Sequence, residues 1–249
     1  MIREDDIRAA VRRYKDRSGA LSLPLKAALI DMDGVLYDSM KYHTLAWQRM
    51  MSEIGVGCSR DEFYLYEGMT GAATIELLMK RSFGKSVTAE ESAALYRKKT
   101  EYFKSYGERE TMPGAADMLA VFRDSDVDRV LVTGSGQQSL IGTLSHDYPG
   151  MFADDKRVTA SDVVHGKPAP EPYLRGLEKA GVLCSEAIVV ENAPLGVKSG
   201  HDAGCFVCAV TTGPIPESEM LRAGADIVFS SMPEFAASVT DLVRIMREA

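Results

Sequence analysis

The 249-residue sequence contains no hydrophobic run approaching the ~20 residues that a membrane-spanning helix needs. It also lacks an excess of positive charge, since 29 Lys and Arg stand against 36 Asp and Glu, for a net charge of -7. This balance argues against general nucleic-acid binding. Residues 1–17 are too highly charged to form the apolar part of a secretory signal. We therefore expect a cytoplasmic protein, a monomer or weak dimer, that binds neither nucleic acid nor membrane.

Cysteine is scarce, with four residues in the whole sequence. Cys205 and Cys208 have the spacing of a redox motif. They belong, however, to an apolar run that predicts a buried strand, in which residues three apart face opposite sides. We interpret them as small buried hydrophobic residues.

Hydrophobic residues make up 45% of the chain, which is enough for a sizeable core. Short apolar runs, each followed by a polar or glycine-rich turn, predict strands at 26–30, 129–132, 157–160, 187–190, 206–210 and 226–229. Segments with helical spacing lie between most of these runs. The alternation predicts an α/β fold with a doubly wound, mostly parallel sheet.

One long stretch, residues 39–111, interrupts the alternation. Its apolar residues keep helical spacing, and no part of it predicts a strand convincingly. A block of this size can form a domain, and its position after the first strand places it over the strand ends, where open α/β sheets bind ligands. We expect an N-terminal helical extension (1–24), an α/β core (25–38 and 112–249) and a helical cap domain (39–111).

Two aspartates directly follow the first predicted strand. Asp31 and Asp33 are two residues apart and project to the same side of an extended segment, just before Gly34. Two crowded carboxylates repel each other unless a cation joins them, and Mg²⁺ prefers such oxygen ligands. Asp-x-Asp-Gly is also a common turn pattern. This segment alone therefore leaves a metal site and an ordinary turn equally open.

Polar groups also follow three later strands. Residues 133–135 (Thr-Gly-Ser) form a turn that could hold an anion, although this is ordinary turn chemistry. Lys167 lies in a loop with three prolines that would hold its ammonium group at a fixed point, although most lysines are solvated at the surface. Glu191 and Asn192 end the fourth strand with oxygen donors suited to Mg²⁺.

Together these motifs resemble the haloacid dehalogenase (HAD) superfamily of aspartate-nucleophile phosphotransferases. The resemblance extends from about residue 25 to the C-terminus. Its four motifs correspond, in order, to the segment that begins at Asp31, to Thr133, to Lys167 and to Glu191-Asn192. Segment 39–111 is similar to the helical cap of the subclass that includes β-phosphoglucomutase and phosphoglycolate phosphatase.

The resemblance implies a Mg²⁺-dependent enzyme that acts on a small phosphorylated metabolite. Asp31 would attack phosphorus and form an aspartyl-phosphate, while Asp33, protonated at first, would act as general acid and then as general base. The resemblance also implies a cis peptide bond between Lys167 and Pro168. The implied site residues are Asp31, Asp33, Thr133 and Lys167 for catalysis, Gly134, Ser135, His43 and Lys99 for substrate binding, and Asp31, Asp33 (through its carbonyl), Glu191 and Asn192 for the metal. His43 could equally well pack in the interior.

The sequence departs from the family pattern at two places. Asn192 stands where the family usually has Asp, which removes one negative charge from the expected metal site. In the cap, Gly71 stands where mutases of the β-phosphoglucomutase type carry a phosphate-binding Arg, and Glu67 stands where a basic residue is usual. Because Arg is the natural ligand for a second phosphate group, its absence favours a phosphatase.

We therefore expect a Mg²⁺-dependent phosphatase that hydrolyses a small phosphate monoester, such as a sugar phosphate. One alternative is a β-phosphoglucomutase-like sugar phosphomutase in which Lys80, Arg81 or Lys99 replaces the missing Arg. A second alternative is a non-catalytic phosphate-binding protein, which the loss of charge at Asn192 would allow.

Overall fold

The computed structural model describes residues 2–107, 110–135 and 138–249. Its centre is a six-stranded sheet in the order β3-β2-β1-β4-β5-β6, in which every neighbouring pair is parallel. The strands are β1 (Ala27–Ile30), β2 (Asp128–Val132), β3 (Arg157–Val158), β4 (Ala187–Glu191), β5 (Phe206–Val210) and β6 (Ile227–Phe229). The predicted fold class is confirmed, and β3 is shorter than its apolar run indicated.

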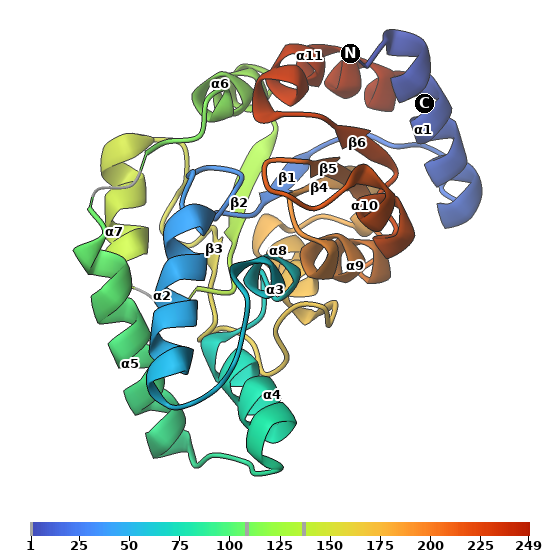
Figure 1. Cartoon of the computed structure of the whole chain (residues 1–249). Helices are drawn as coiled ribbons and strands as arrows, with labels where there is room; N and C mark the ends of the chain where they lie inside the picture. The colour runs from blue at the N-terminus through green and yellow to red at the C-terminus, as the bar shows by residue number, and fades with distance from the viewer. Residues whose placement is uncertain (1, 108–109, 136–137) are drawn as a thin grey trace.

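Helices cover both faces of this sheet (Figure 1). One face carries the helices α1 (Glu4–Ser18), α6 (Ala115–Asp124), α7 (Gln138–Asp147) and α11 (Met232–Glu248). The other face carries the helices α8 (Glu171–Ala180), α9 (Pro194–Asp202) and α10 (Glu217–Ala223). A 3-10 turn, η1 (Cys184–Glu186), precedes β4. Alternate residues of each strand enter the two apolar clusters: Ala28 and Ile30 face the first set, and Ala27 and Leu29 the second. Such double burial explains why the strands are continuous apolar runs.

The interpretation of the cysteines agrees with this packing. Cys205 belongs to one apolar cluster and Cys208 to the other, and all four cysteines are free thiols. Burial raises the pKa of both thiols, which makes them poor nucleophiles.

A helical block lies between β1 and α6 in the sequence. It consists of α2 (Met40–Glu53), α3 (Arg60–Leu65), α4 (Gly71–Phe83) and α5 (Ala89–Ser105), and its described residues form no strand. Ser59, Thr70 and Thr88 cap α3, α4 and α5 by accepting hydrogen bonds from backbone N–H groups. Met50, Phe63 and Leu78 belong to an apolar cluster that is separate from those of the sheet. This separate core supports the proposed division into core and cap, whose boundaries at residues 39 and 111 stay a prediction.

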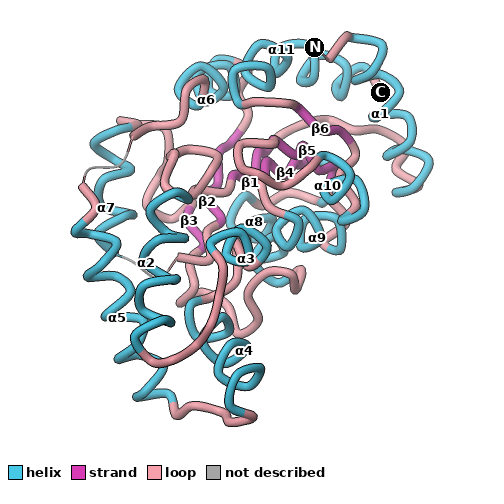
Figure 2. The backbone as a smooth tube through the Cα atoms, viewed as in Figure 1, coloured by secondary structure: helices cyan, strands magenta, loops and turns pink. Residues whose placement is uncertain are grey.

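Figure 2 shows loops connecting the helical block to the sheet, with the N-terminal helix far from that block. Helix α1 packs against α11, and the hydroxyl of Tyr14 donates a hydrogen bond to the carbonyl of Gly204 at 2.9 Å. The N-terminal extension is therefore part of the α/β body rather than of the cap. None of the helices in the described ranges has the length and apolar character to cross a membrane.

Candidate active site

Asp31 stands at the carboxyl end of β1, in the middle of the sheet. Its backbone N–H donates to the carbonyl of Val190 at 3.0 Å, which continues the pairing with β4 for one residue. The chain then turns at Gly34, whose φ of +83° is a left-handed conformation that disfavours other residues. A Cβ atom on Gly34 would overlap the side-chain amide of Asn192. Glycine thus lets the turn approach the end of β4.

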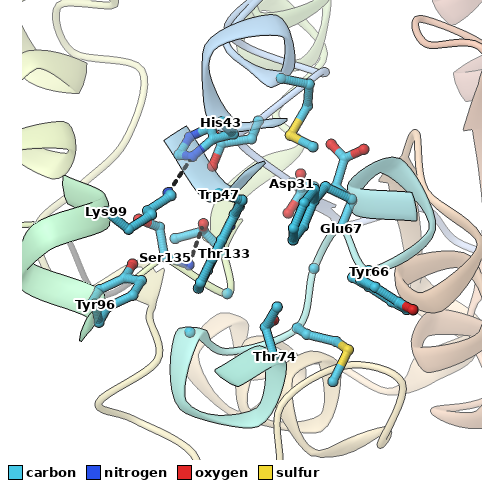
Figure 3. Close-up of a pocket in the computed structure, with 17 residues that line it drawn as sticks. Asp31, His43, Trp47, Tyr66, Glu67, Thr74, Tyr96, Lys99, Thr133 and Ser135 are labelled. Carbon is cyan, nitrogen blue, oxygen red and sulfur yellow. Dashed lines mark hydrogen bonds and ion pairs between the residues drawn. The ribbon is translucent and has the colours of Figure 1, made fainter. Parts of the chain in front are cut away.

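A pocket opens at this point, between the strand ends and the helical block. Its core wall consists of Asp31, Asp33, Thr133, Gly134 and Ser135. Its cap wall is largely aromatic and apolar and includes Met40, Trp47, Phe63, Tyr66, Met69 and Tyr96. Figure 3 shows Tyr96 and Lys99 entering from α5, with Glu67 on the opposite side.

Lys167 lies directly behind Asp31 and is only 3% exposed. Its ammonium donates to Asp31 Oδ1 at 2.6 Å, to Glu191 Oε1 at 2.5 Å and to the carbonyl of Val132 at 3.1 Å. Burial works to lower the pKa of Lys167, but the charges of Asp31 and Glu191 outweigh it and raise this pKa, so the lysine stays charged. The Lys167–Pro168 peptide bond is cis, as predicted.

Glu191 is held by donors on both of its carboxylate oxygens. Oε1 accepts from Lys167 and from the hydroxyl of Tyr173 at 2.7 Å, while Oε2 accepts from the backbone N–H groups of Asn192 and Ala193. Sequence reasoning assigned this residue to the metal. That assignment stays a prediction; in the structure the contacts of Glu191 also fix Lys167, which is a positioning role.

Burial raises the pKa of Asp31 above its ordinary value. The positive charge of Lys167 lowers the pKa of Asp31, but Lys167 is shared between Asp31 and Glu191. The negative charge of Glu191 raises the pKa of Asp31 further. A second positive charge near Asp31 would therefore favour its ionised form, which is the form needed for attack on phosphorus.

Asp33 begins a chain of hydrogen bonds that enters the cap. Its Oδ1 accepts from Ser39 Oγ at 2.5 Å and lies 3.1 Å from His43 Nε2, while Lys99 Nζ lies 2.6 Å from His43 Nδ1. Because the carboxylate only accepts, Nε2 carries the ring hydrogen, and the neutral ring accepts from Lys99 at Nδ1. Lys99 is 2% exposed and lies over the ring of Trp47. His43 thus lines the pocket, and its ring also stacks on that of Phe103. Its role in substrate binding stays a prediction.

The charge state of Asp33 differs from the expectation that it starts protonated. Burial works to raise its pKa, but His43, the Ser39 hydroxyl and Lys99 outweigh burial and lower this pKa. The surroundings of Asp33 therefore favour its carboxylate form. Sequence reasoning could not reveal this, because His43 on α2 and Lys99 on α5 come from other elements than Asp33.

Lys99 gives a prediction for stability as a function of pH. Burial lowers the pKa of Lys99 to about 7 in the folded protein, against an ordinary value of 10.5. Between these values the unfolded chain binds more protons, so the contribution of Lys99 to the free energy of unfolding rises with pH, by about 1.4 kcal/mol per unit. The difference in free energy of unfolding, wild type minus Lys99→Met, should rise by about 2 kcal/mol from pH 7 to pH 9.

Urea denaturation in metal-free buffer at both pH values measures this difference. The matched control is Lys98→Met, which removes a neighbouring, partly exposed lysine that pairs with Glu53 and should give a constant difference. A constant difference for Lys99→Met as well would mean that Lys99 remains charged in the folded protein.

Asn192 and Glu67 meet across the boundary between core and cap. The side-chain amide of Asn192 donates to Glu67 Oε1 at 2.8 Å, and both residues are buried. Burial, reinforced by the charges of Asp31, Glu191 and Asp33, raises the pKa of Glu67 well above its ordinary value. Asn192 Oδ1 is buried and has no hydrogen-bond partner among the residues that the structure describes.

The residues present fit a Mg²⁺ ion. Within the described ranges, no three His, Cys, Asp or Glu side chains are grouped so as to hold a metal by themselves. Mg²⁺ does not require such a group, since it commonly binds one or two carboxylates and completes its shell with water and substrate phosphate. The Asp31 carboxylate and the unpartnered oxygen of Asn192 are donors of the appropriate kind.

The predicted site residues fall into two layers. Those that line the pocket are Asp31, Asp33, His43, Lys99, Thr133, Gly134 and Ser135, and those behind it are Lys167, Glu191 and Asn192. Thr133 Oγ1 accepts a hydrogen bond from the backbone N–H of Ser135 at 3.0 Å, which shapes the turn after β2. A Cβ atom on Gly134 would overlap the carbonyl of Gly68, so this glycine permits close approach of the cap loop.

Sequence reasoning missed Ser39 and the aromatic cap residues Trp47 and Tyr96 as parts of the site. Helical spacing in the sequence does not distinguish a side chain in a core from one in a pocket wall.

The parallel sheet, the aspartate at the end of its first strand and the helical block above it define an α/β enzyme of the phosphotransferase type. The profile of haloacid dehalogenase-like hydrolases matches residues 25–204. The chain is 31% identical over 185 residues to hexitol phosphatase A of Escherichia coli, covering 74% of this chain and 82% of that protein. It is 26% identical over 226 residues to phosphoglycolate phosphatase of Thiobacillus denitrificans, covering 88% and 97%.

A solved structure from Bacteroides vulgatus, named provisionally as a β-phosphoglucomutase, superimposes with a TM-score of 0.95 at 42% identity, covering 98% of this chain and all of that one. The chain belongs to the haloacid dehalogenase-like hydrolase family. This membership confirms the predicted enzyme class, because the named phosphatases of the family are phosphoric monoester hydrolases.

Proposed function

We propose that the protein is a Mg²⁺-dependent phosphatase that hydrolyses a small phosphate monoester, such as a sugar phosphate, through an aspartyl-phosphate on Asp31. The observation that carries this proposal is the position of Asp31, which faces the pocket at the end of β1 with the ammonium of Lys167 at 2.6 Å. Relatives that act as phosphatases support the substrate class.

Asp31 acts as the nucleophile. Its carboxylate attacks phosphorus, the leaving alkoxide departs, and the covalent intermediate divides one difficult step into two easier ones. Lys167, fixed by Glu191 and Val132, offsets the repulsion between the Asp31 carboxylate and the incoming phosphate. The hydroxyl of Thr133 and the turn at 133–135 bind phosphoryl oxygens on the core side of the pocket.

Asp33 supplies and then removes a proton. Its carboxylate gains a proton when the phosphate dianion enters, because a neighbouring negative charge raises a carboxyl pKa. It gives this proton to the leaving alkoxide and later accepts one from the water that hydrolyses the intermediate. Asp31, Asn192 and the carbonyl of Asp33 would hold Mg²⁺, which when bound neutralises charge on the phosphoryl oxygens.

The cap wall favours a phosphatase over a mutase. A Cβ atom on Gly71 would overlap the ring of Tyr96, so no side chain, and hence no Arg, fits at position 71 beside that ring. Lys80 and Arg81 form ion pairs with Glu76 and Glu62 on the surface of the cap and do not line the pocket. These two positions therefore do not replace the missing Arg.

Lys99 remains as the one sequence alternative that lines the pocket, and it hydrogen-bonds to His43. Together with the likeness to a structure provisionally named as a mutase, this keeps a phosphomutase as the second candidate. The aromatic wall opposite the core is suited to the carbon face of a ring or chain rather than to a second phosphate group.

We expect net release of inorganic phosphate from sugar and polyol monophosphates, with little isomerisation. Without Arg at position 71, retention of a bisphosphate should be weaker by roughly tenfold to a few hundredfold, because a charge-assisted hydrogen bond is worth roughly 1.5–3 kcal/mol. Water then intercepts the aspartyl-phosphate. The measurement is a substrate panel with Mg²⁺, in which free phosphate and isomerised sugar phosphate are both quantified, with and without chelator.

Efficient conversion of β-glucose 1-phosphate to glucose 6-phosphate, with bisphosphate as activator and negligible free phosphate, would establish the mutase instead. Neither product from any ester would indicate the non-catalytic phosphate-binding protein. Activity that survives chelation would contradict the role of Mg²⁺.

A further inference from the structure

The two places at which the sequence departs from its family meet in the structure. Glu67 lies in the cap, in the loop after α3, and Asn192 lies in the core, directly after β4. They are 125 residues apart, yet Asn192 Nδ2 donates to Glu67 Oε1 at 2.8 Å. Glu67 is 7% exposed, and its carboxylate enters the wall of the same pocket as Asp31.

The positive charges around the pocket are already engaged elsewhere. Lys167 is bonded to Asp31 and Glu191, and Lys99 is bonded to His43 beside Asp33. In the described parts of the chain, no cationic side chain contacts Glu67, whose hydrogen-bond partner is a neutral amide. Burial removes the hydration of Glu67, and one neutral hydrogen bond does not compensate for it, so the ionised form of Glu67 requires a cation nearby.

Asn192 adds a second unmet requirement at the same place. Its Oδ1 is buried and accepts no hydrogen bond from any described residue, which is rare for a buried amide oxygen. The Asn192 side chain thus contacts Glu67, which has no cation beside it among the described residues, and its own Oδ1 has no hydrogen-bond donor there. A divalent cation with oxygen ligands meets both needs, whereas a water molecule would leave the carboxylate without a counter-charge.

We propose that Glu67 supplies a carboxylate from the cap to the divalent cation site beside Asp31, in place of the charge that Asn192 does not provide. The proposal rests on the proposed function only in placing the cation beside Asp31. Cation binding then joins cap and core, since one acidic ligand belongs to each.

Direct cation titration of the substrate-free protein tests this assignment. Free Mn²⁺ is followed by electron paramagnetic resonance, with Mg²⁺ as competitor. Glu67→Gln is the informative variant because Gln keeps the size and can still accept the hydrogen bond from Asn192, so only the charge is lost. We expect Mn²⁺ affinity to fall by about tenfold to a hundredfold, the range typical for loss of a group that supports a metal site.

Two further variants complete the design. Glu90→Gln removes an exposed cap carboxylate on α5 and controls for overall charge, so its Mn²⁺ affinity should equal that of the wild type. Glu67→Gln/Asn192→Asp moves the carboxylate from cap to core, and it should recover most of the affinity that Glu67→Gln loses. Unfolding midpoints of all variants confirm that each is folded.

Wild-type Mn²⁺ affinity in Glu67→Gln, or no recovery in the double variant, would overturn the proposal. The outcome is separate from that of the proposed function. Phosphatase activity combined with an unaffected Glu67→Gln would leave the function standing and remove the ligand role. If Mn²⁺ affinity changes as expected in the variants but no ester is hydrolysed, the ligand role of Glu67 would stand and the proposed phosphatase function would fall.

Discussion

Replacement of Asp31 with Asn is expected to abolish phosphate release and leave the fold intact. The amide is nearly isosteric and can still accept the hydrogen bond from Lys167, but it does not attack phosphorus. Loss of an essential nucleophile typically lowers kcat by several orders of magnitude, and we expect at least about a thousandfold. The measurement is the rate of phosphate release with the best ester of the panel.

Asp117→Asn is the matched control for Asp31→Asn, because Asp117 is exposed on α6 and does not line the pocket. It should retain full activity, and circular dichroism should show both variants folded. Activity of Asp31→Asn within about tenfold of the wild type would exclude a covalent mechanism through this residue.

Lys167→Met is expected to lose both activity and stability. The substitution keeps much of the buried volume but leaves Asp31 and Glu191 facing each other without a cation. Breaking a buried ion pair by removing one partner typically costs about 3–5 kcal/mol in the free energy of unfolding. Activity should fall by at least about a thousandfold, because the charge that steadies the nucleophile and the incoming phosphate is gone.

A second substitution separates the two effects of Lys167→Met. Adding Glu191→Gln removes one of the unpaired carboxylates and should restore part of the stability but none of the activity. Lys198→Met on α9 removes an exposed lysine paired with Asp202 and should change stability by less than about 1 kcal/mol. Wild-type stability in Lys167→Met would mean that the buried carboxylates are protonated in the folded protein.

The sheet was predictable from the sequence because its strands are buried on both faces. A continuous apolar run such as that at β4 results from burial of the strand by helices on both faces of the sheet. Glycines after several helices mark where the next apolar run begins. Asp31 was predictable for a related reason, since a charged residue directly after a buried run must stand at the sheet edge, where parallel strands place ligands.

The partners of the site residues were not predictable in the same way. Hydrogen bonds from Lys99 to His43 and from Asn192 to Glu67 join segments 56 and 125 residues apart. Local spacing carries no information on such contacts, which depend on how the cap packs over the core. The pKa of Asp33 depends on the same contacts, and its protonation at the start of the reaction stays a prediction.

The most direct test of the account is to identify the covalent intermediate on the enzyme. The wild-type protein is mixed with Mg²⁺ and its best substrate, quenched in acid during turnover, digested and analysed by mass spectrometry. The account predicts one added phosphoryl group on the peptide that contains Asp31, absent from the Asp31→Asn variant. Turnover without this modification, or a phosphoryl group on another residue, would contradict it.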